Sequence, residues 1–317
     1  MIVVLALFLV ALVMSALIYP VAISQLARAR MGQLIREEGP AAHQVKAGTP
    51  TAGGLVFLLV ALVLYVIADR STAGAFVLLA LFAGGALGFL DDYAKISGGH
   101  NLGLRARQKI VIQLATGAVL GLLAMAWHFT VQLVPFDGRH DLGGWIVLVS
   151  AVAVAAGSNA FNLTDGSDGL AAGTGAISFG ALAAIAVLEH SSAGIMPAVL
   201  AGALVGFLFY NLFPARLFMG DTGSLALGTA MAAAAITTGF IWYLPLLALV
   251  FVIETVSVIA QVASFKMTGK RIIRMSPLHN HFIVSGWKET PLALWFWAGS
   301  LLAAVLTVAL ARPGSAA

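Results

Sequence analysis

The sequence contains no cysteine, so disulfide bonds and thiolate chemistry are excluded. Charged side chains are also scarce, because Asp, Glu, Lys and Arg together make up only 9% of the 317 residues. Such a chain cannot cover a globular surface with polar groups, which excludes an ordinary water-soluble fold. A long polar segment that could form a separate soluble unit is missing too, and we therefore expect one domain spanning residues 1–317.

Long hydrophobic runs make up most of the sequence. Hydrophobic residues make up 61% of the chain and the mean hydropathy is +1.00. Several runs exceed the roughly 18 apolar residues that indicate a membrane-spanning helix. The first run, Met1 to about Ser24, has no basic residue before it and so lacks the basic region of a cleavable signal peptide. We predict an all-α integral membrane protein with about ten transmembrane helices.

Lysine and arginine are distributed unequally along this threading. Fourteen of the 17 fall in loops on one side, and the other three are Arg70, Arg139 and Arg312. Basic residues near the ends of spans concentrate on the cytoplasmic side of a membrane. This pattern predicts a cytoplasmic side that carries the basic loops, the longest of them at residues 266–290, with both chain termini outside.

Five aspartates stand where apolar runs end, all on the predicted cytoplasmic side. They are Asp91 and Asp92 in GFLDDYAK, Asp165 and Asp168 in NLTDGSDG, and Asp221 in FMGDTGS. Carboxylates that face one another repel unless a cation or protonation relieves them, and all-oxygen ligation favours magnesium or manganese. Lys95 and Lys109 lie nearby and suit a polyanionic substrate. We therefore expect a magnesium site and phosphate chemistry at this face.

Other polar residues leave alternatives open. His279 and His281 in SPLHNHF are two residues apart, a spacing that suits a loop better than one face of a helix. Glu254 falls inside the predicted ninth span, where burying a charged side chain is costly. A polar packing role and a role in the site are both open for it. The basic stretch Lys266 to Arg274 is either a topology signal with affinity for anionic lipid or a direct substrate contact.

Five stretches occur in a recognisable order across nearly the whole chain: HQVKAGTPTAGG, GFLDDYAK, NAFNLTDGSDGLA, FMGDTGSLALG and MSPLHNHF. They closely resemble the motifs of the phospho-N-acetylmuramoyl-pentapeptide transferases, a branch of the polyprenyl-phosphate sugar-1-phosphate transferase superfamily. The resemblance implies a ten-helix enzyme of peptidoglycan synthesis in the bacterial cytoplasmic (inner) membrane. With Mg²⁺ it would move phospho-MurNAc-pentapeptide from UDP-MurNAc-pentapeptide to undecaprenyl phosphate, giving lipid I and UMP.

The resemblance also implies roles for single residues. Asp221 matches the magnesium ligand, and Asp91 and Asp92 match an aspartate pair beside the lipid phosphate; with the motif histidines the expected catalytic set is Asp91, Asp92, Asp221, His279 and His281. The expected substrate-binding set is Lys46, Lys95, Lys109, Asn162, Asp165, Asp168, Asn211, Phe218 and Gln261. Asn280 stands where the family has a middle histidine, and Ile283 where it usually has an acidic residue. Asparagine cannot carry a proton charge, so either the middle position is tolerant or the handling of substrate differs in this protein.

Two other functions remain to be distinguished. The sister branch of the superfamily would use UDP-GlcNAc, although the GTPT stretch and the PLH-type loop favour the pentapeptide branch. A transporter for an anionic solute belongs to a different class, but paired halves with matching interrupted spans are not visible in the sequence. No nucleic-acid partner is expected, and the sequence leaves a homodimer open.

Overall fold

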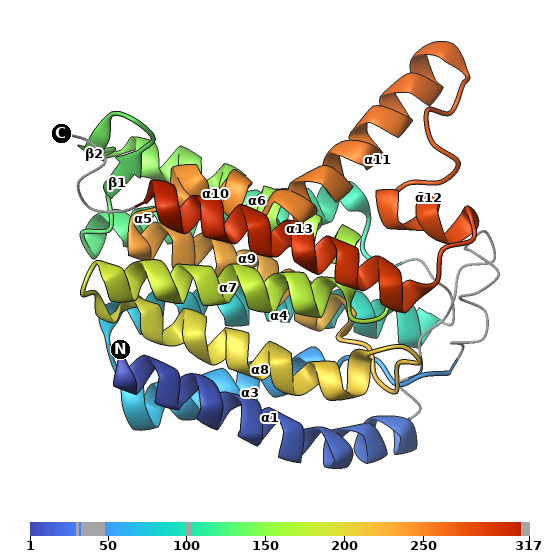
Figure 1. The fold of residues 1–317 in the computed structure, drawn as a ribbon, viewed down its shortest axis with the longest axis horizontal. Coiled ribbons are helices and arrows are strands. Elements are labelled where there is room, and N and C mark those ends of the chain that lie inside the picture. The colour runs from blue at the N-terminus through green and yellow to red at the C-terminus, as the bar shows by residue number, and fades with distance from the viewer. Residues whose placement is uncertain (30–31, 33–47, 99–102, 312–317) are drawn as a thin grey trace.

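The computed structural model describes residues 1–29, 32, 48–98 and 103–311 (Figure 1). The expected substrate-binding Lys46 lies outside these residues. The first half of the chain forms α1 (Ile2–Arg28), α3 (Gly54–Leu64), the π-helix η1 (Tyr65–Asp69), α4 (Thr72–Gly98), α5 (Ala106–Ala126), the strands β1 (Val131–Val134) and β2 (Gly138–Asp141), and α6 (Trp145–Thr164). The second half forms α7 (Leu170–Leu188), the 3-10 turn η2 (Ser192–Gly194), α8 (Ile195–Asn211), α9 (Gly220–Thr238), η3 (Ile241–Tyr243), α10 (Leu244–Leu247), α11 (Leu249–Thr268), α12 (Leu278–Val284) and α13 (Glu289–Leu310).

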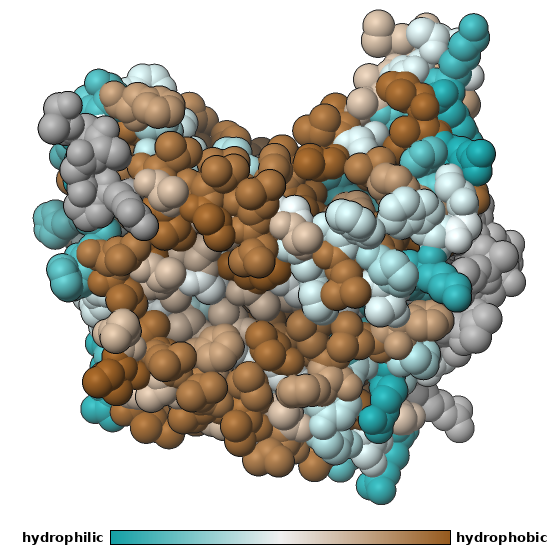
Figure 2. Space-filling view, viewed as in Figure 1, coloured by the Kyte–Doolittle hydropathy of each residue, from teal (hydrophilic) through white to brown (hydrophobic). Residues whose placement is uncertain are grey.

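The chain is an all-α membrane protein. Within the described residues, eight helices are long and apolar enough to cross a bilayer: α1, α4, α5, α6, α7, α8 with its preceding turn, α11 and α13. Gly54–Asp69 is a shorter apolar segment. Figure 2 shows a broad hydrophobic band over the bundle, with hydrophilic residues concentrated toward its two ends. The number of about ten spans therefore stays a prediction. It would be reached if Gly54–Asp69 and α9 each crossed the membrane as well.

Helix α9 forms the centre of the bundle. It packs against α3, α4, α6 and α7, and nearly all of its side chains are buried. Because other helices surround it, α9 can consist largely of Gly, Ala, Ser and Thr, whose small side chains allow close backbone approach. At Gly157 of α6 and Gly228 of α9 the two backbones touch, since a Cβ built on either glycine would overlap the carbonyl oxygen of the other. The small residues of α9 therefore set its distance from its neighbours.

The start of α1 and the end of α13 lie at the same end of the bundle (Figure 1). This end also carries the β1–β2 hairpin, and we call it the hairpin end. Helix α12 and the turn between α6 and α7 lie at the opposite end, which we call the aspartate end. The described ends of the chain thus lie at one end of the bundle, and the placement of both termini outside stays a prediction. Which end faces the cytoplasm remains a prediction.

Three stretches adopt local structure that the sequence pattern does not indicate. The polar stretch after Leu90 continues as helix α4 to Gly98, so Asp91 and Lys95 occupy neighbouring turns of one helix. His279 and His281 lie on the short helix α12 and not in a loop. Residues 128–144 contain an antiparallel hairpin, which docks on the bundle because the buried Gln132 donates to Ile236 O and accepts from Ile241 N–H.

Helix α11 leaves the bundle at an angle and projects from it at the aspartate end (Figure 1). Its contacts with α6 and α13 involve its N-terminal part, where Val250, Phe251 and Glu254 are buried. Farther along, Ile259, Val262 and Phe265 are exposed. The chain then returns through residues 269–277 to α12, which packs against α11 and α13.

Candidate functional site

Two aspartates and two lysines from three helices form one cluster at the aspartate end. Lys95 Nζ lies 2.7 Å from Asp91 Oδ2 and 2.9 Å from Asp221 Oδ2. Lys109 Nζ of α5 lies 3.0 Å and 3.1 Å from the same two oxygens. The other oxygen of Asp91 accepts a hydrogen bond from Leu104 N–H at 2.7 Å. Two carboxylates thus stand side by side because two ammonium groups lie between them and offset their repulsion.

Asp92 is directed into the start of α9. Its carboxylate accepts hydrogen bonds from Asp221 N–H, Thr222 N–H and the Thr222 hydroxyl, at 3.1, 2.9 and 2.7 Å. The first backbone N–H groups of a helix have no partner inside the helix, and a carboxylate there also interacts favourably with the helix dipole. Asp92 therefore acts as a cap supplied by another helix, and it fixes where Asp221 stands.

Asn162 orients the second oxygen of Asp221. Its side-chain nitrogen donates to Asp221 Oδ1 at 2.9 Å and to Ser224 Oγ at 2.8 Å. Asn162 lies in the last turn of α6, which ends at the C-cap residue Asp165. Three of the five motif aspartates, Asp91, Asp92 and Asp221, thereby meet with Asn162 around the first turn of α9.

The turn between α6 and α7, which we call the aspartate loop (residues 165–169), is tied down from three sides. Asn211 accepts from Gly169 N–H, and its own amide donates to Leu217 O. Asp168 accepts from Ala215 N–H at 2.8 Å. Glu289 accepts from the Ser167 hydroxyl at 2.9 Å and from Asp168 N–H at 3.0 Å. The carboxylate of Asp168 is thus held beside the segment that leads into α9.

The two motif histidines have different surroundings. His279 is 1% exposed in its side chain and lies against the buried Glu254 of α11, with 3.1 Å between His279 Nδ1 and Glu254 Oε2. His281 is half-buried, and its Nδ1 accepts from Arg274 N–H at 3.2 Å. Asn280 is buried, and its Oδ1 has no hydrogen-bond partner among the described residues. Only His279 of the pair points into the protein.

Gln261 and Phe218 serve the surrounding backbone. The side-chain oxygen of Gln261 accepts from Ile272 N–H and Ile273 N–H, and its nitrogen donates to Ile273 O. These bonds fold the chain that follows α11. The backbone of Phe218 accepts from Gly53 N–H and donates to Pro50 O, which joins the segment before α9 to the segment before α3. Neither side chain contacts the carboxylate and lysine cluster through a hydrogen bond.

The donor set fits a metal only in part. Among the described residues, no group of three or more His, Asp or Glu side chains is arranged to hold an ion. Magnesium, however, is commonly bound through one or two carboxylates together with substrate phosphates. Asp221 offers such a carboxylate, and its Oδ2 already has two cationic nitrogens within 3.1 Å. The residues therefore fit an ion that the substrate helps to bind.

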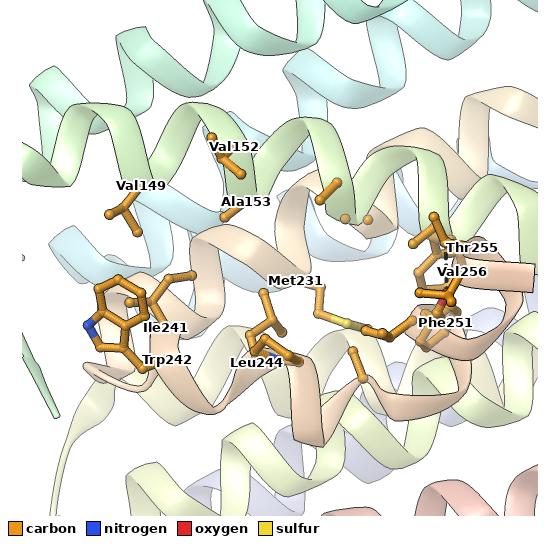
Figure 3. A pocket seen from close by; sticks show the side chains of 18 of the residues that line it. Val149, Val152, Ala153, Met231, Ile241, Trp242, Leu244, Phe251, Thr255 and Val256 are labelled. Atoms are coloured by element: carbon orange, nitrogen blue, oxygen red, sulfur yellow. Dashed lines mark hydrogen bonds between the residues drawn. The ribbon is translucent and has the colours of Figure 1, made fainter. Parts of the chain in front are cut away.

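A hydrophobic cavity of about 490 Å³ lies between α6, α9, α10 and α11 (Figure 3). Its wall is almost wholly apolar, with Trp242 at one end and Phe251, Thr255 and Val256 at the other. Phe161 stacks on Phe251 with 4.7 Å between the ring centroids, and it directly precedes Asn162 in the chain. The cavity thus approaches the residue that orients Asp221.

Sequence reasoning missed Glu289 and did not resolve Glu254. Glu289 looks like an ordinary charged residue at the start of a span, and nothing local shows that its carboxylate reaches residues more than 120 positions away. Glu254 carried a usable signal, because an ionisable residue inside a span is costly and is retained for a reason.

Comparisons with known proteins identify the family of the chain. The family described as glycosyl transferase family 4 matches residues 74–239, which include every member of the carboxylate and lysine cluster. A protein of Heliobacterium modesticaldum is 48% identical over 96% of this chain and 97% of its own length. Proteins of Geobacillus thermodenitrificans and Desulforudis audaxviator are each 46% identical over 95% of this chain, covering 94% and 96% of their own lengths. All three are named phospho-N-acetylmuramoyl-pentapeptide-transferase. The chain therefore belongs to the phospho-N-acetylmuramoyl-pentapeptide transferases, multi-pass enzymes of the bacterial inner membrane.

Proposed function

We propose that this chain transfers phospho-MurNAc-pentapeptide from UDP-MurNAc-pentapeptide to undecaprenyl phosphate, forming lipid I and UMP in peptidoglycan synthesis. Family membership supports the reaction type. The observation that carries the site assignment is the cluster of Asp91, Asp221, Lys95 and Lys109. A site for phosphate groups needs cations, and these two lysines supply them between the two carboxylates.

In this proposal the aspartate end faces the cytoplasm, where the UDP substrate is found. The distribution of lysine and arginine supports this orientation. The diphosphate binds at the first turn of α9, and Lys95 and Lys109 turn from the aspartates toward its oxygens. Asn162, Asp168 and Asn211 hold the nucleotide side of the substrate.

Magnesium is the proposed cofactor, and Asp221 is the residue that would hold it together with the substrate phosphates. When bound, the ion would neutralise charge on the diphosphate. Asp92 keeps a supporting role in our proposal, because its oxygens already accept three hydrogen bonds from Asp221 and Thr222. It holds the start of α9 so that the Asp221 carboxylate stays in place.

We favour direct attack by the lipid phosphate. An oxygen of that phosphate forms a bond to the sugar-side phosphorus, and the bond from this phosphorus to the bridging oxygen breaks, so that UMP leaves with the electron pair. A phosphate monoester has a second pKa of about 6 and needs little deprotonation near neutral pH. Asp91 Oδ2 lies within 3.0 Å of two ammonium groups, which reduces its strength as a nucleophile and argues against an aspartyl-phosphate intermediate.

The apolar cavity is the proposed site for part of the lipid acceptor. Its wall carries almost no polar surface, and a prenyl chain is an apolar ligand of the kind such a cavity binds. Its inner end at Phe161 adjoins Asn162, so a chain lying there would keep its phosphate near the first turn of α9.

The test uses purified protein with UDP-MurNAc-pentapeptide, undecaprenyl phosphate and Mg²⁺. We expect release of UMP that is lost in Asp221→Ala and retained in Asp137→Ala, an exposed aspartate of the hairpin. Replacing the first substrate by UDP-GlcNAc tests the sister branch. Solute uptake into sealed vesicles without UMP release would refute the proposal in favour of a transporter.

A further inference from the structure

Glu254 is a fully buried carboxylate that the proposed mechanism does not use. Its side chain is fully buried in the N-terminal half of α11. Glu254 Oε1 accepts from the backbone N–H of His279 at 3.1 Å, and Glu254 Oε2 lies 3.1 Å from His279 Nδ1. Burying a carboxylate is costly unless hydrogen bonds compensate for the lost water. Here both carboxylate oxygens are directed at one residue of α12.

This pairing determines which ring nitrogen of His279 is free. An ionised carboxylate only accepts hydrogen bonds, so the nitrogen that faces Glu254 Oε2 carries a proton. The hydrogen bond at one ring nitrogen sets the state of the other, and in a neutral imidazole Nε2 then becomes an acceptor. Glu254 thus fixes the orientation of the ring and also its tautomer.

The free nitrogen lies at the aspartate loop. His279 Nε2 is buried and has no hydrogen-bond partner among the described residues. Gly166, which is exposed, lies directly over it, because a Cβ built on this glycine would overlap His279 Nε2. A buried polar atom without a partner costs about 1–3 kcal/mol. Such an atom beside a ligand-binding loop is suited to meet a donor group of a ligand.

We propose that Glu254 is a positioning residue for the transfer reaction. It holds the Nδ1–H of His279, so that Nε2 accepts a hydrogen bond from an N–H or O–H group of the bound UDP substrate at the aspartate loop. This inference rests on the proposed function, because it assigns the UDP substrate to that loop. Glu254 itself touches no substrate and acts through His279.

The variant Glu254→Gln separates this role from simple packing. Glutamine has nearly the same shape, and its oxygen can still accept from His279 N–H. Its NH₂ group then faces Nδ1, which must become the acceptor, and the proton moves to Nε2. The hydrogen bonds between residue 254 and α12 are kept. His279 Nε2, however, changes from an acceptor to a donor at the aspartate loop.

We expect Glu254→Gln to lower kcat/KM for the UDP substrate by about 10- to 100-fold, the usual cost of losing a partner that orients a histidine. The KM for undecaprenyl phosphate and the melting temperature should stay close to those of the parent. Ser257→Ala is the matched control, because its hydroxyl donates only to the backbone oxygen of Glu254 in the same helix. Full activity in Glu254→Gln, or an equal loss toward both substrates with a lower melting temperature, would overturn the proposal.

A second measurement needs neither substrate nor a stable Glu254 variant. The ¹⁵N chemical shifts of histidine side chains in the parent protein report the tautomer, and the signal of His279 is the one missing from His279→Gln. We expect a proton on Nδ1 and an unprotonated Nε2. A proton on Nε2 alone would refute the positioning role even if the protein makes lipid I. An inactive parent enzyme with the expected tautomer would instead count against the proposed function.

Discussion

Lys95 and Asp221 are 126 positions apart in the chain, yet Lys95 Nζ lies 2.9 Å from Asp221 Oδ2. Lys109 reaches the same oxygen from a third helix. Both ammonium groups stand where a cation must bind if Asp221 is to be a metal ligand. A divalent ion therefore competes with two lysines for this carboxylate.

Replacing Lys95 by methionine tests this competition. With one of two competing charges removed, Asp221 and Asp91 attract a cation more strongly, and we expect Mn²⁺ to bind at least roughly tenfold more tightly without substrate. The transfer rate should fall, because a cation for the diphosphate is lost. Electron paramagnetic resonance measures Mn²⁺ binding. Arg139→Met at the hairpin end is the control, and equal Mn²⁺ affinity in the two variants would contradict the competition.

Thr222→Val tests the cap that Asp92 forms on α9. The substitution removes the hydroxyl that donates to Asp92 Oδ2 at 2.7 Å and keeps the side-chain shape. We expect a loss of about 1 kcal/mol in the free energy of unfolding, with a lower transfer rate. Thermal unfolding in detergent measures the first effect. Thr237→Val on the same helix removes a hydroxyl that donates only to Ala234 O, and an equal effect on transfer there would argue against the cap.

Glu289→Ala tests the anchoring of the aspartate loop. The loop loses an acceptor for the Ser167 hydroxyl and Asp168 N–H, and misplacing a positioning group by about 1 Å can cost about 10²-fold in rate. We expect kcat/KM for the UDP substrate to fall by about this factor. Steady-state UMP release measures it. Glu289→Gln keeps one acceptor oxygen and should lose less; the reverse order of the two variants would exclude this explanation.

Ala156→Trp tests the cavity as a lipid site. Ala156 lines the cavity from α6 and is exposed, so an indole there fills space without displacing the core. We expect a KM for undecaprenyl phosphate that rises by about tenfold or more, with little change for the UDP substrate. Val119→Trp places the same ring on an exposed position of α5 outside the cavity. A similar rise in both variants would show that the cavity is not the acceptor site.

The fold class could be predicted from the sequence because the length of the apolar runs and the scarcity of charge do not depend on tertiary contacts. The grouping of Asp91, Asp92 and Asp221 could be predicted as well, since all three stand where runs end. The position of Lys95 and Lys109 between the two carboxylates could not be predicted. It depends on how α4, α5 and α9 pack, and no short-range pattern encodes that packing.

The secondary structure around the site was harder to predict for the same reason. The polar residues after Leu90 are typical of a loop, but Asp91 and Lys95 pair one turn apart and Asp92 caps α9, so helix α4 continues. The spacing of His279 and His281 suggested a loop, whereas a short helix brings only His279 to Glu254. In both places contacts with another helix outweighed the local pattern.

The contact between Gly157 and Gly228 links the chemistry to the architecture of the bundle. These glycines lie on the helices that carry Asn162 and Asp221, and the carbonyl oxygen of each fills the space where the other would carry a methyl group. Any larger residue at either position would wedge the two helices apart and draw the amide of Asn162 away from the carboxylate that it steadies. Two residues without side chains thus determine how closely Asn162 and Asp221 approach each other.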